Sequence, residues 1–348
     1  MAKKEELVVG IDIGTHAVKV CQLQKVAKGY RLLAAGSAAL PAEAVEDGVL
    51  NEAEAVGKVV SALLKNLKIR NRKVGISISG YSVIVKKINL ETMSDEELGK
   101  HLATVAEQYI PFDVNDVYLD FQRLPSKKPG SDRDDIMLVA AKKDVVNEYL
   151  TLLSALKLNP VLVDVDGFAL SNIWSVNAGN EVNTALIDIG ASKMNINIIA
   201  DGVSVLARDV VVGSEQLTNQ IAVALDLEYD QAEQIKIGVL PVSEDQEKVR
   251  SIFTKVCTQW VMEIKKATDL YRTNNPKRPL QSIVLSGGGA KVQGLTEFIA
   301  QETQLSTVVF DPFQFIQLDE KKFDRHYLAA IGPEMAIAAG LAIRPATL

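Results

Sequence analysis

The chain has 348 residues, of which 47% are apolar and 24% are charged, and its formal net charge is −6. This composition excludes a disordered, collagen-like or disulfide-rich chain, the length suggests two domains or one domain with a large insertion, and the acidic balance argues against general nucleic-acid binding. Only two cysteines are present and no apolar run or signal sequence indicates a membrane span or secretion, so we expect a protein of a reducing compartment that reaches membranes only through partners.

The first predicted element is a β-hairpin over residues 7–23. The apolar run Val-Val-Gly-Ile-Asp-Ile contains one acid, Asp12, and ends at a turn formed by Gly14 and Thr15. A second β-branched run follows and includes Lys19. The sequence therefore places this turn at the end of a buried strand.

The region between the two halves of the chain is predicted to alternate strands and helices. Ser94 precedes three acidic residues, which is a typical helix start because the helix dipole favours acids in the first turn, and Pro111 marks the end of that helix. A polar loop is expected at 125–135. The predicted strands are 73–79, 83–88, 117–124, 136–141 and 160–165, and a second helix covers 144–156. From residue 83 the order is β-α-β-β-α-β, which is typical of a compact α+β insertion.

A second hairpin repeats the pattern of the first about half the chain later. Ala-Leu-Ile-Asp-Ile-Gly-Ala-Ser leads through Asp188 into a turn at Gly190, and apolar residues alternate in the strand that follows. The chain therefore contains Asp-Ile-Gly twice. Self-similarity at so long a period indicates duplicated lobes rather than a solenoid, whose repeats span about 20–50 residues.

Two helices are predicted after this hairpin. The first covers 213–225, and the second covers 229–238 and ends at Gly238 as a C-cap. Glu233 and Lys236 are three residues apart and therefore share a face of the second helix. This spacing is equally typical of an ordinary ion pair in solvent.

Near the C-terminus a β-branched strand leads into three glycines, Gly287, Gly288 and Gly289, and then into an amphipathic helix. Glycines at such a junction let the backbone approach a ligand closely. A last helix, over 332–343, contains small residues throughout, which allow the close helix crossing that a hinge between lobes requires.

Each of these signals has an ordinary explanation when it is taken singly, since Asp-x-Gly is most often a turn and three glycines are most often a flexible loop. Two matching hairpins in separate halves, followed by a strand, three glycines and a helix, form the ordered triplet of the actin-like ATPase superfamily, which this sequence resembles. The resemblance implies an α/β, RNase H-like fold of two actin-like lobes. Residues 164–174 and 332–343 resemble the helices that connect the lobes in this superfamily.

The resemblance also implies how the site binds ATP or ADP. Asp12 and Asp188 are expected to hold Mg²⁺ through its waters, because magnesium loses its hydration reluctantly. Backbone amides of the two turns are expected to bind the phosphates, and Lys19 has the spacing of the phosphate-contacting lysine of actin. The turn residues are Gly14, Thr15 and His16 in the first hairpin and Gly190, Ala191 and Ser192 in the second.

Further positions carry over from the superfamily to the nucleotide and the attacking water. Gly213 begins the element that follows the second phosphate turn, and Glu233 and Lys236 share the face that closes over the adenosine with the three glycines. Asp166 aligns with the residue that orients the attacking water, although a helix N-cap also explains an aspartate there. The second turn departs from the family pattern, because Ser192 replaces a glycine and a threonine is lost. This departure favours nucleotide binding over hydrolysis.

The insertion and the C-terminus narrow the resemblance to the PilM family of type IV pilus assembly proteins, which is related to FtsA. The α+β insertion resembles the FtsA-type 1C subdomain, and the sequence stops without the membrane-binding tail of FtsA. We therefore expect residues 1–86, 166–184 and 333–348 to form the first lobe (1A), 87–165 the insertion (1C) and 185–332 the second lobe (2A/2B), with 2B at about 214–278.

This family resemblance implies a cytoplasmic, ATP-binding component of the inner-membrane platform of type IV pili, which serve twitching motility, with weak or no ATP turnover. The implied partners are the cytoplasmic N-terminal peptide of PilN, bound in a groove between the first lobe and the insertion, and other platform proteins, while a homo-oligomer stays open. A type II secretion or competence system is an alternative setting. Two alternative functions remain: an FtsA-like filament-forming division protein and a small-molecule kinase of the same fold.

Overall fold

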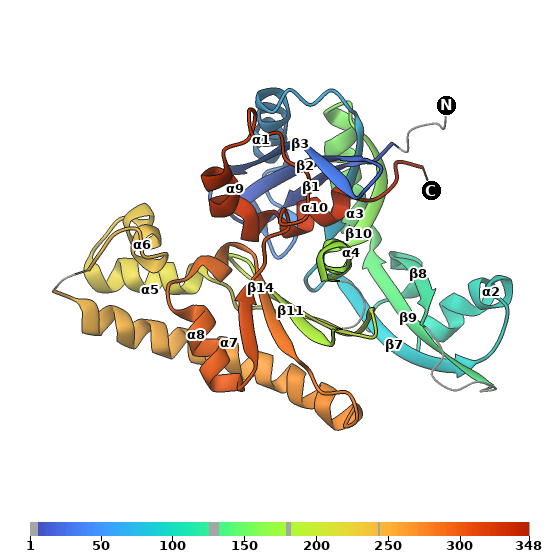
Figure 1. Cartoon of the computed structure of the whole chain (residues 1–348). Coiled ribbons are helices and arrows are strands. Elements are labelled where there is room, and N and C mark those ends of the chain that lie inside the picture. The colour runs from blue at the N-terminus through green and yellow to red at the C-terminus, as the bar shows by residue number, and fades with distance from the viewer. Residues whose placement is uncertain (1–5, 125–131, 179–181, 243, 348) are drawn as a thin grey trace.

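Two five-stranded sheets with the same strand order form the two lobes (Figure 1). The computed structural model describes residues 6–124, 132–178, 182–242 and 244–347. The first sheet has the order β3-β2-β1-β6-β10 and the second has the order β13-β12-β11-β14-β15. In each sheet the first three strands are antiparallel and the last two run parallel to the central strand. The duplication predicted from the two hairpins, and the actin-like two-lobed fold, are confirmed.

The strands of the first sheet are β1 (Val9–Ile13), β2 (Ala17–Lys25), β3 (Tyr30–Ala39), β6 (Lys73–Ile78) and β10 (Asn159–Val165). Those of the second are β11 (Thr184–Ile189), β12 (Met194–Ala200), β13 (Val203–Val210), β14 (Ser282–Ser286) and β15 (Ser306–Val309). A two-stranded ribbon, β4 (Val45–Glu46) and β5 (Val49–Leu50), belongs to the first lobe.

Alternation along each central strand gives each sheet an outer and an inner face. In β1, Val9 and Ile11 belong to the core under α1 (Ala53–Asn66) and α3 (Lys143–Ala155). In β11, Ile187 belongs to a separate core under α5 (Glu215–Leu225), α7 (Gln246–Asn274) and α8 (Leu295–Thr303), whereas Leu186 belongs to a third core between the two lobes. Asp12 directly follows Ile11, and Asp188 directly follows Ile187, so each acid points to the opposite face of its strand. Both acids therefore lie on inner faces.

The inter-lobe core is built around α4 (Asp166–Ala178) and α10 (Ala336–Ala342), with α9 (Arg325–Ile331) before α10. The two helices cross at backbone contact, because a Cβ added to Gly340 would lie 1.8 Å from the Ala169 carbonyl oxygen. A Cβ on Gly10 would lie 2.1 Å from the Ala338 carbonyl oxygen, so β1 also packs directly on α10. The small residues predicted for this helix crossing are therefore required by it.

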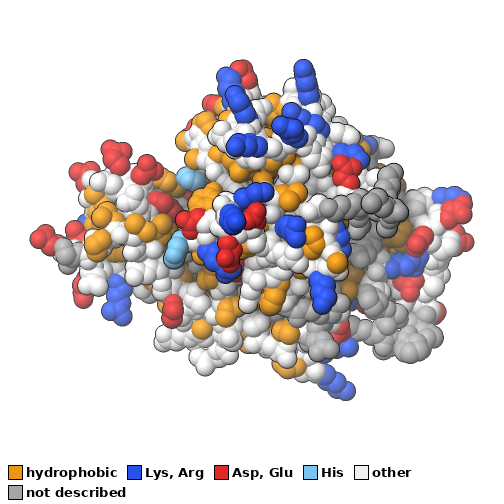
Figure 2. Space-filling model, turned by 45° about the horizontal axis from the view of Figure 1, so that its top comes forward, with side chains coloured by type: hydrophobic (Ala, Val, Ile, Leu, Met, Phe, Trp, Pro, Cys, Tyr) orange, Lys and Arg blue, Asp and Glu red, His pale blue; other side chains and the backbone are white. Residues whose placement is uncertain are grey.

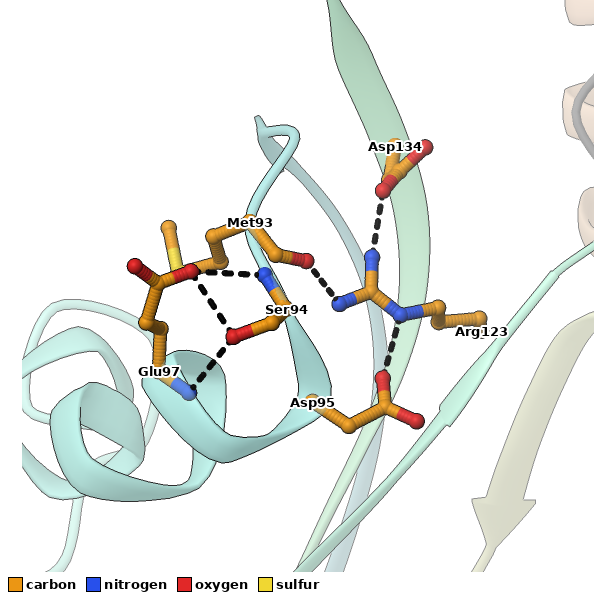
Figure 3. A network of polar contacts seen from close by, with 6 residues as sticks. All are labelled: Met93, Ser94, Asp95, Glu97, Arg123 and Asp134. Carbon is orange, nitrogen blue, oxygen red and sulfur yellow. Dashed lines mark hydrogen bonds and ion pairs between the residues drawn. The ribbon is translucent and has the colours of Figure 1, made fainter.

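The insertion contains the three-stranded sheet β7-β9-β8 and the helix α2 (Asp95–Ala106), with a core of its own. Its strands are β7 (Val83–Glu91), β8 (Val117–Arg123) and β9 (Arg133–Lys142). Figure 3 shows how the start of α2 is fixed: Ser94 and Glu97 form a capping box, and Arg123 reaches from β8 to Asp95 and Asp134. The helix start predicted at Ser94 is confirmed.

The insertion differs from the expected range 87–165 at both ends. Its element order is the predicted one, but β10 pairs with β6, and α3 packs in the first-lobe core, so only β7 to β9 form a separate sheet. Pairing decides this, because the apolar pattern of β10 fits either sheet equally well. The loop expected at 125–135 extends too far toward the C-terminus, because β9 begins at Arg133, opposite Glu91. Residues 125–131 of this loop lie outside the described residues.

Two helices end close to where they were predicted. The helix α2 ends at Ala106 rather than at Pro111, because the chain turns there and buries Ile110 in the insertion core. The helix α6 (Tyr229–Lys236) is followed by Gly238 with φ +76°, the left-handed conformation of a terminating glycine. Within the described ranges, no helix combines the length and the apolar character that a membrane crossing needs.

Candidate functional site

The two Asp-Ile-Gly hairpins of the chain place their acids at corresponding positions. In the first hairpin, Asp12 lies opposite Lys19 in the register of β1 and β2. In the second, Asp188 lies opposite Asn195 in the register of β11 and β12. Each pair is seven residues apart, so the two hairpins match position by position.

The turns that follow these acids have the same backbone geometry and meet each other. The Gly14 amide donates to the Ala17 carbonyl at 3.1 Å, and the Gly190 amide donates to the Lys193 carbonyl at 2.8 Å. Between the turns, the hydroxyl oxygens of Thr15 and Ser192 lie 2.8 Å apart. The two lobes therefore bring the two predicted phosphate turns together.

A cavity of about 280 Å³ lies between the lobes at this contact. Most of the predicted site residues line it, from both hairpins, from α6 and from the glycine run. They are Asp12, Gly14, Thr15, His16, Lys19, Asp166, Asp188, Gly190, Ala191, Ser192, Glu233, Lys236, Gly287 and Gly288.

Two predicted glycines do not line the cavity but lie behind its wall. A Cβ on Gly213 would lie 2.0 Å from the Ala191 carbonyl oxygen, and a Cβ on Gly289 would lie 2.3 Å from Cγ2 of Ile189. Gly288, in contrast, has nothing within 4 Å of an added Cβ. Gly213 and Gly289 thus support the second turn, whereas Gly288 faces open space.

The carboxylates of the cavity influence one another. Burial raises the pKa of Asp188 to about 7; a hydrogen bond from Ser286 opposes this shift, and the neighbouring carboxylates of Asp12 and Asp166 add to it. Burial also raises the pKa of Asp12, although Lys19, whose Nζ lies 3.2 Å from Asp12 Oδ2, opposes that shift. A cation between these acids would offset their repulsion.

Direct metal coordination by a protein cage is not what the site offers. Within the part of the chain that the structure describes, no three acidic, histidine or cysteine side chains converge closely enough to ligate a metal ion. Asp12 and Asp188 line one cavity from opposite hairpins, and the Asp12 carboxylate adds to the raised pKa of Asp188, so these two acids fit a hydrated divalent cation.

The predicted pair on α6 is not a solvated ion pair. Lys236 is only 5% exposed, its Nζ lies 2.6 Å from Glu233 Oε2, and Thr218 Oγ1 donates to the same Glu233 oxygen at 2.7 Å. Burial lowers the pKa of Lys236, and the Glu233 carboxylate opposes this shift. The ordinary explanation of this spacing is therefore wrong, and the pair is a fixed part of the cavity wall.

His16 contributes a ring contact that the sequence did not indicate. Its imidazole stacks on Tyr229 of α6 with ring centroids 6.0 Å apart, and its carbonyl accepts from the Leu40 amide. This contact joins the first phosphate turn to the helix expected to cover the adenosine, across the mouth of the cavity.

Asp166, the residue aligned with the water-orienting position, is engaged by two side chains. It is the first residue of α4, the Ser79 hydroxyl donates to its Oδ2, and Lys193 Nζ lies 3.6 Å from that oxygen. Lys193 also donates to Ser79. One oxygen of the Asp166 carboxylate is therefore already engaged by side chains from two other elements.

Sequence analysis missed several residues that line or support the cavity, and four of them form polar contacts with the predicted residues or beside them. Ser286 holds Asp188, and Lys193 holds Asp166; Lys291 and Glu334 form an ion pair of 3.4 Å beside the glycine run. Ser286 directly precedes the three glycines, so its position was a usable signal. The other three depend on tertiary contacts.

The surface charge is uneven on the face that Figure 2 shows. Acidic side chains gather over the end that carries α5 and α6, and Lys and Arg side chains gather over the first lobe. An anionic ligand is therefore repelled from the first of these ends and attracted toward the second.

A second and larger cavity, of about 830 Å³, forms a groove between the first lobe and the insertion. Two of its walls are β8, an edge strand of the insertion sheet, and β10, an edge strand of the first-lobe sheet. Its other lining residues come from β6, β9, α3 and α4 and, in the second lobe, from β13 and the turn before it, together with Arg344 near the C-terminus. An edge strand presents unpaired backbone groups to an extended peptide.

Comparison with protein families gives a match over nearly the whole chain. The family model described as type IV pilus assembly protein PilM matches residues 10–346. Among characterised proteins, the chain is 22% identical over 372 aligned residues to the cell division protein FtsA of Borreliella burgdorferi, with 94% of this chain and 89% of that protein covered.

Solved structures share the fold. A structure of the PilM-PilN type IV pilus biogenesis complex superposes with a TM-score of 0.86 at 24% identity, covering 97% of this chain and 98% of that chain. The ethanolamine utilization protein EutJ of Carboxydothermus hydrogenoformans gives a TM-score of 0.58 at 13% identity, with coverage of 99% and 91%. MreB5 of Spiroplasma citri bound to ADP gives 0.54 at 13% identity, with coverage of 97% and 95%.

Proposed function

The chain belongs to the family of the type IV pilus assembly protein PilM, and on that premise we propose that it is the ATP-binding, actin-like component of a pilus assembly platform. Its lobes are 1A, built on the first sheet, and 2A/2B, built on the second, with the 1C insertion between β6 and β10. In the cell it lies in the cytoplasm and reaches the inner membrane through its partner, in support of twitching motility.

The observation that carries nucleotide binding is the contact of Thr15 with Ser192 beside two inward-facing acids. Turn residues from both lobes line one cavity, and the backbone amides of such turns can bind a chain of phosphates. Asp12 and Asp188 would hold Mg²⁺ through its waters, and the ion would supply charge neutralisation to the phosphates. MreB5 of Spiroplasma citri, with the same fold, has been solved with ADP and with AMPPNP bound.

The three glycines and α6 serve the adenosine in this proposal. Gly287 has φ +82°, and a side chain there would clash with the backbone of Ile189, so the glycine run lies flat along the second turn. Gly288 leaves open space beside the buried pair of Glu233 and Lys236. The base would lie between these two walls, with polar groups on one side.

Turnover is weak in this proposal. Asp166 is the only residue that we assign to the orientation of attacking water, and the Ser79 hydroxyl donates to its Oδ2. The second turn also has Ser192 where the superfamily has a glycine, and it lacks the superfamily's threonine. The bound nucleotide is therefore hydrolysed slowly, and the protein acts through which nucleotide is bound rather than through turnover.

The partner is the cytoplasmic N-terminal peptide of PilN, bound in the groove between β8 and β10. An extended peptide can add to either strand edge by backbone hydrogen bonds and place alternate side chains in the apolar lining, which includes Phe121, Val163 and Phe168. The similar PilM-PilN structure motivates the identity of this partner. Other platform proteins and further copies of the chain are additional partners.

Isothermal titration calorimetry of the full chain tests the nucleotide part of this proposal. We expect ATP and ADP to bind in the presence of Mg²⁺ with dissociation constants below about 1 mM. The absence of binding for both nucleotides would contradict the proposed function. A pull-down from membranes with the full chain tests the partner part: a bitopic protein with a short cytoplasmic segment should be captured.

A further inference from the structure

Lys193 is a cation of the second turn that pairs with the first lobe instead of with its own hairpin. In the first hairpin, Lys19 pairs with the acid of the same hairpin, Asp12. The position corresponding to Lys19 in the second hairpin is Asn195, and the lysine is shifted by two residues to position 193. The two turns are therefore alike in backbone and different in where they place positive charge.

The shift lets the Lys193 ammonium reach across the lobe boundary. Its Nζ donates to Ser79 Oγ at the end of β6 and lies 3.6 Å from Asp166 Oδ2 at the start of α4. Asp188, in its own hairpin, is instead held by Ser286 at 2.8 Å. The side chain of Lys193 is 22% exposed and lines the cavity, so a ligand in the cavity can reach it.

A terminal phosphate competes for this ammonium. An ammonium has three donors and no fixed plane, so it can exchange a carboxylate for a phosphate oxygen with little rearrangement. A triphosphate has such a group near the second turn, and a diphosphate lacks it. When bound at Asp12 and Asp188, Mg²⁺ would supply positive charge near Asp166, whose carboxylate acts electrostatically on both of those acids.

We propose that Lys193 is the residue that distinguishes a nucleoside triphosphate from a diphosphate, by exchanging Asp166 and Ser79 for the terminal phosphate. The inference rests on the proposed nucleotide site. It adds a specificity-determining residue, because the other cations of the cavity, Lys19, Lys236 and Lys291, each keep an acidic partner inside their own lobe or beside the glycine run.

The exchange acts on the segment that leads into the insertion. Ser79 loses one of its two side-chain partners when Lys193 moves and keeps its bond to Asp166, and the next residue, Gly80, donates its amide to Asp209 Oδ2 of β13. Asn195 holds the other oxygen of Asp209 at 2.7 Å. Binding of the terminal phosphate therefore changes the contacts of the segment just before β7, the first strand of the insertion.

Calorimetry with ATP and ADP, each with Mg²⁺, on the full chain tests the proposal. In Lys193→Ala, the affinity for ATP should fall by about tenfold or more, the magnitude of one lost charge-assisted hydrogen bond, while the affinity for ADP changes little. Lys193→Arg, which keeps the charge, should retain a preference for ATP. Lys291→Ala removes a cation from the same cavity and should change both affinities by the same factor.

The outcomes separate this inference from the function on which it rests. If the wild-type chain binds neither nucleotide, the proposed function fails and this inference fails with it. If the wild-type chain binds both and Lys193→Ala weakens both equally, only the role of Lys193 is overturned. Melting curves of each variant without nucleotide, within a few degrees of wild type, establish that the comparison is made between folded proteins.

Discussion

The hydroxyl groups of Thr15 and Ser192, 177 positions apart in the sequence, lie 2.8 Å from each other. They belong to turns that correspond position by position in the two lobes, so their contact marks where the duplicated halves meet. A ligand that binds both turns at once stabilises the closed arrangement of the lobes by mass action.

Replacement of either inner-face acid should weaken binding of Mg-nucleotide without unfolding the chain. In Asp12→Ala and Asp188→Ala we expect a loss of about tenfold or more in affinity, the range found for groups that act on a metal through its outer shell. Calorimetry with and without Mg²⁺ measures it. Unchanged Mg-ATP binding in both variants would refute the site.

Stability without nucleotide should depend on Asp188 and pH. The native chain binds the Asp188 proton more tightly than the unfolded chain does, because the pKa of this carboxyl is about 7 in the folded chain and its ordinary value is 3.8. Stability from this group is therefore present at low pH and is lost as the pH rises toward 7. Asp188→Asn should be more stable than wild type by a margin that grows from about pH 5 to about pH 8. Melting temperatures across that range measure the margin, and one that is constant or shrinks contradicts the prediction.

Substitution by alanine should lower the stability of the chain at Gly289 and leave it unchanged at the neighbouring Gly288. Gly289→Ala places a methyl group 2.3 Å from Ile189 Cγ2 and should destabilise the chain by about 1–3 kcal/mol. Gly288→Ala meets nothing within 4 Å and should leave stability unchanged while narrowing the nucleotide cavity. Denaturant unfolding gives the free energy of unfolding of both variants. Equal values would contradict the close packing of Gly289 against Ile189.

A charge in the groove should block the partner peptide. Val163 on β10 is 37% exposed and lines the groove, so Val163→Asp should lower peptide affinity about tenfold by placing an unpaired charge against an apolar ligand. Val223→Asp is the matched control, since Val223 is 85% exposed on α5 and does not line the groove. Fluorescence anisotropy with a labelled PilN N-terminal peptide measures both. Equal affinities in the two variants would place the peptide elsewhere.

The hydrogen bond between Gly80 and Asp209 should carry nucleotide state to the groove. We expect the peptide affinity of wild type to differ by about fivefold or more with and without Mg-ATP, the lower range of typical coupling. Asp209→Asn should reduce that ratio toward one, and Asp269→Asn, an exposed acid on α7, should leave it unchanged. A wild-type ratio of one would remove the coupling altogether.

Local pattern was enough to predict the parts of the fold that repeat or alternate. Period-two alternation in Val-Val-Gly-Ile-Asp-Ile fixes Asp12 on the face opposite Val9 and Ile11, and the second Asp-Ile-Gly does the same for Asp188. Ser94 and Gly238 predicted a helix start and a helix end for equally local reasons. These features depend on neighbours within a few residues.

Long-range pairing was not accessible in the same way. The short apolar run of β10 fits either sheet, and only its pairing with β6 assigns it to the first lobe. Lys193 occupies a position that the motif leaves unspecified, and its partners Ser79 and Asp166 are contributed by other elements, so the sequence did not single it out. The contact of His16 with Tyr229 has the same origin.

The two strand edges along the groove have a consequence for handling the protein. Within the described part of the chain, β8 and β10 each have a strand neighbour on one side only, so their outer edges present backbone donors and acceptors to whatever binds in the groove. Such edges are templates for self-association. Purified alone at high concentration, the chain should therefore oligomerise through the edges of β8 and β10. Co-expression with the peptide should keep it monodisperse, because the bound peptide covers these edges.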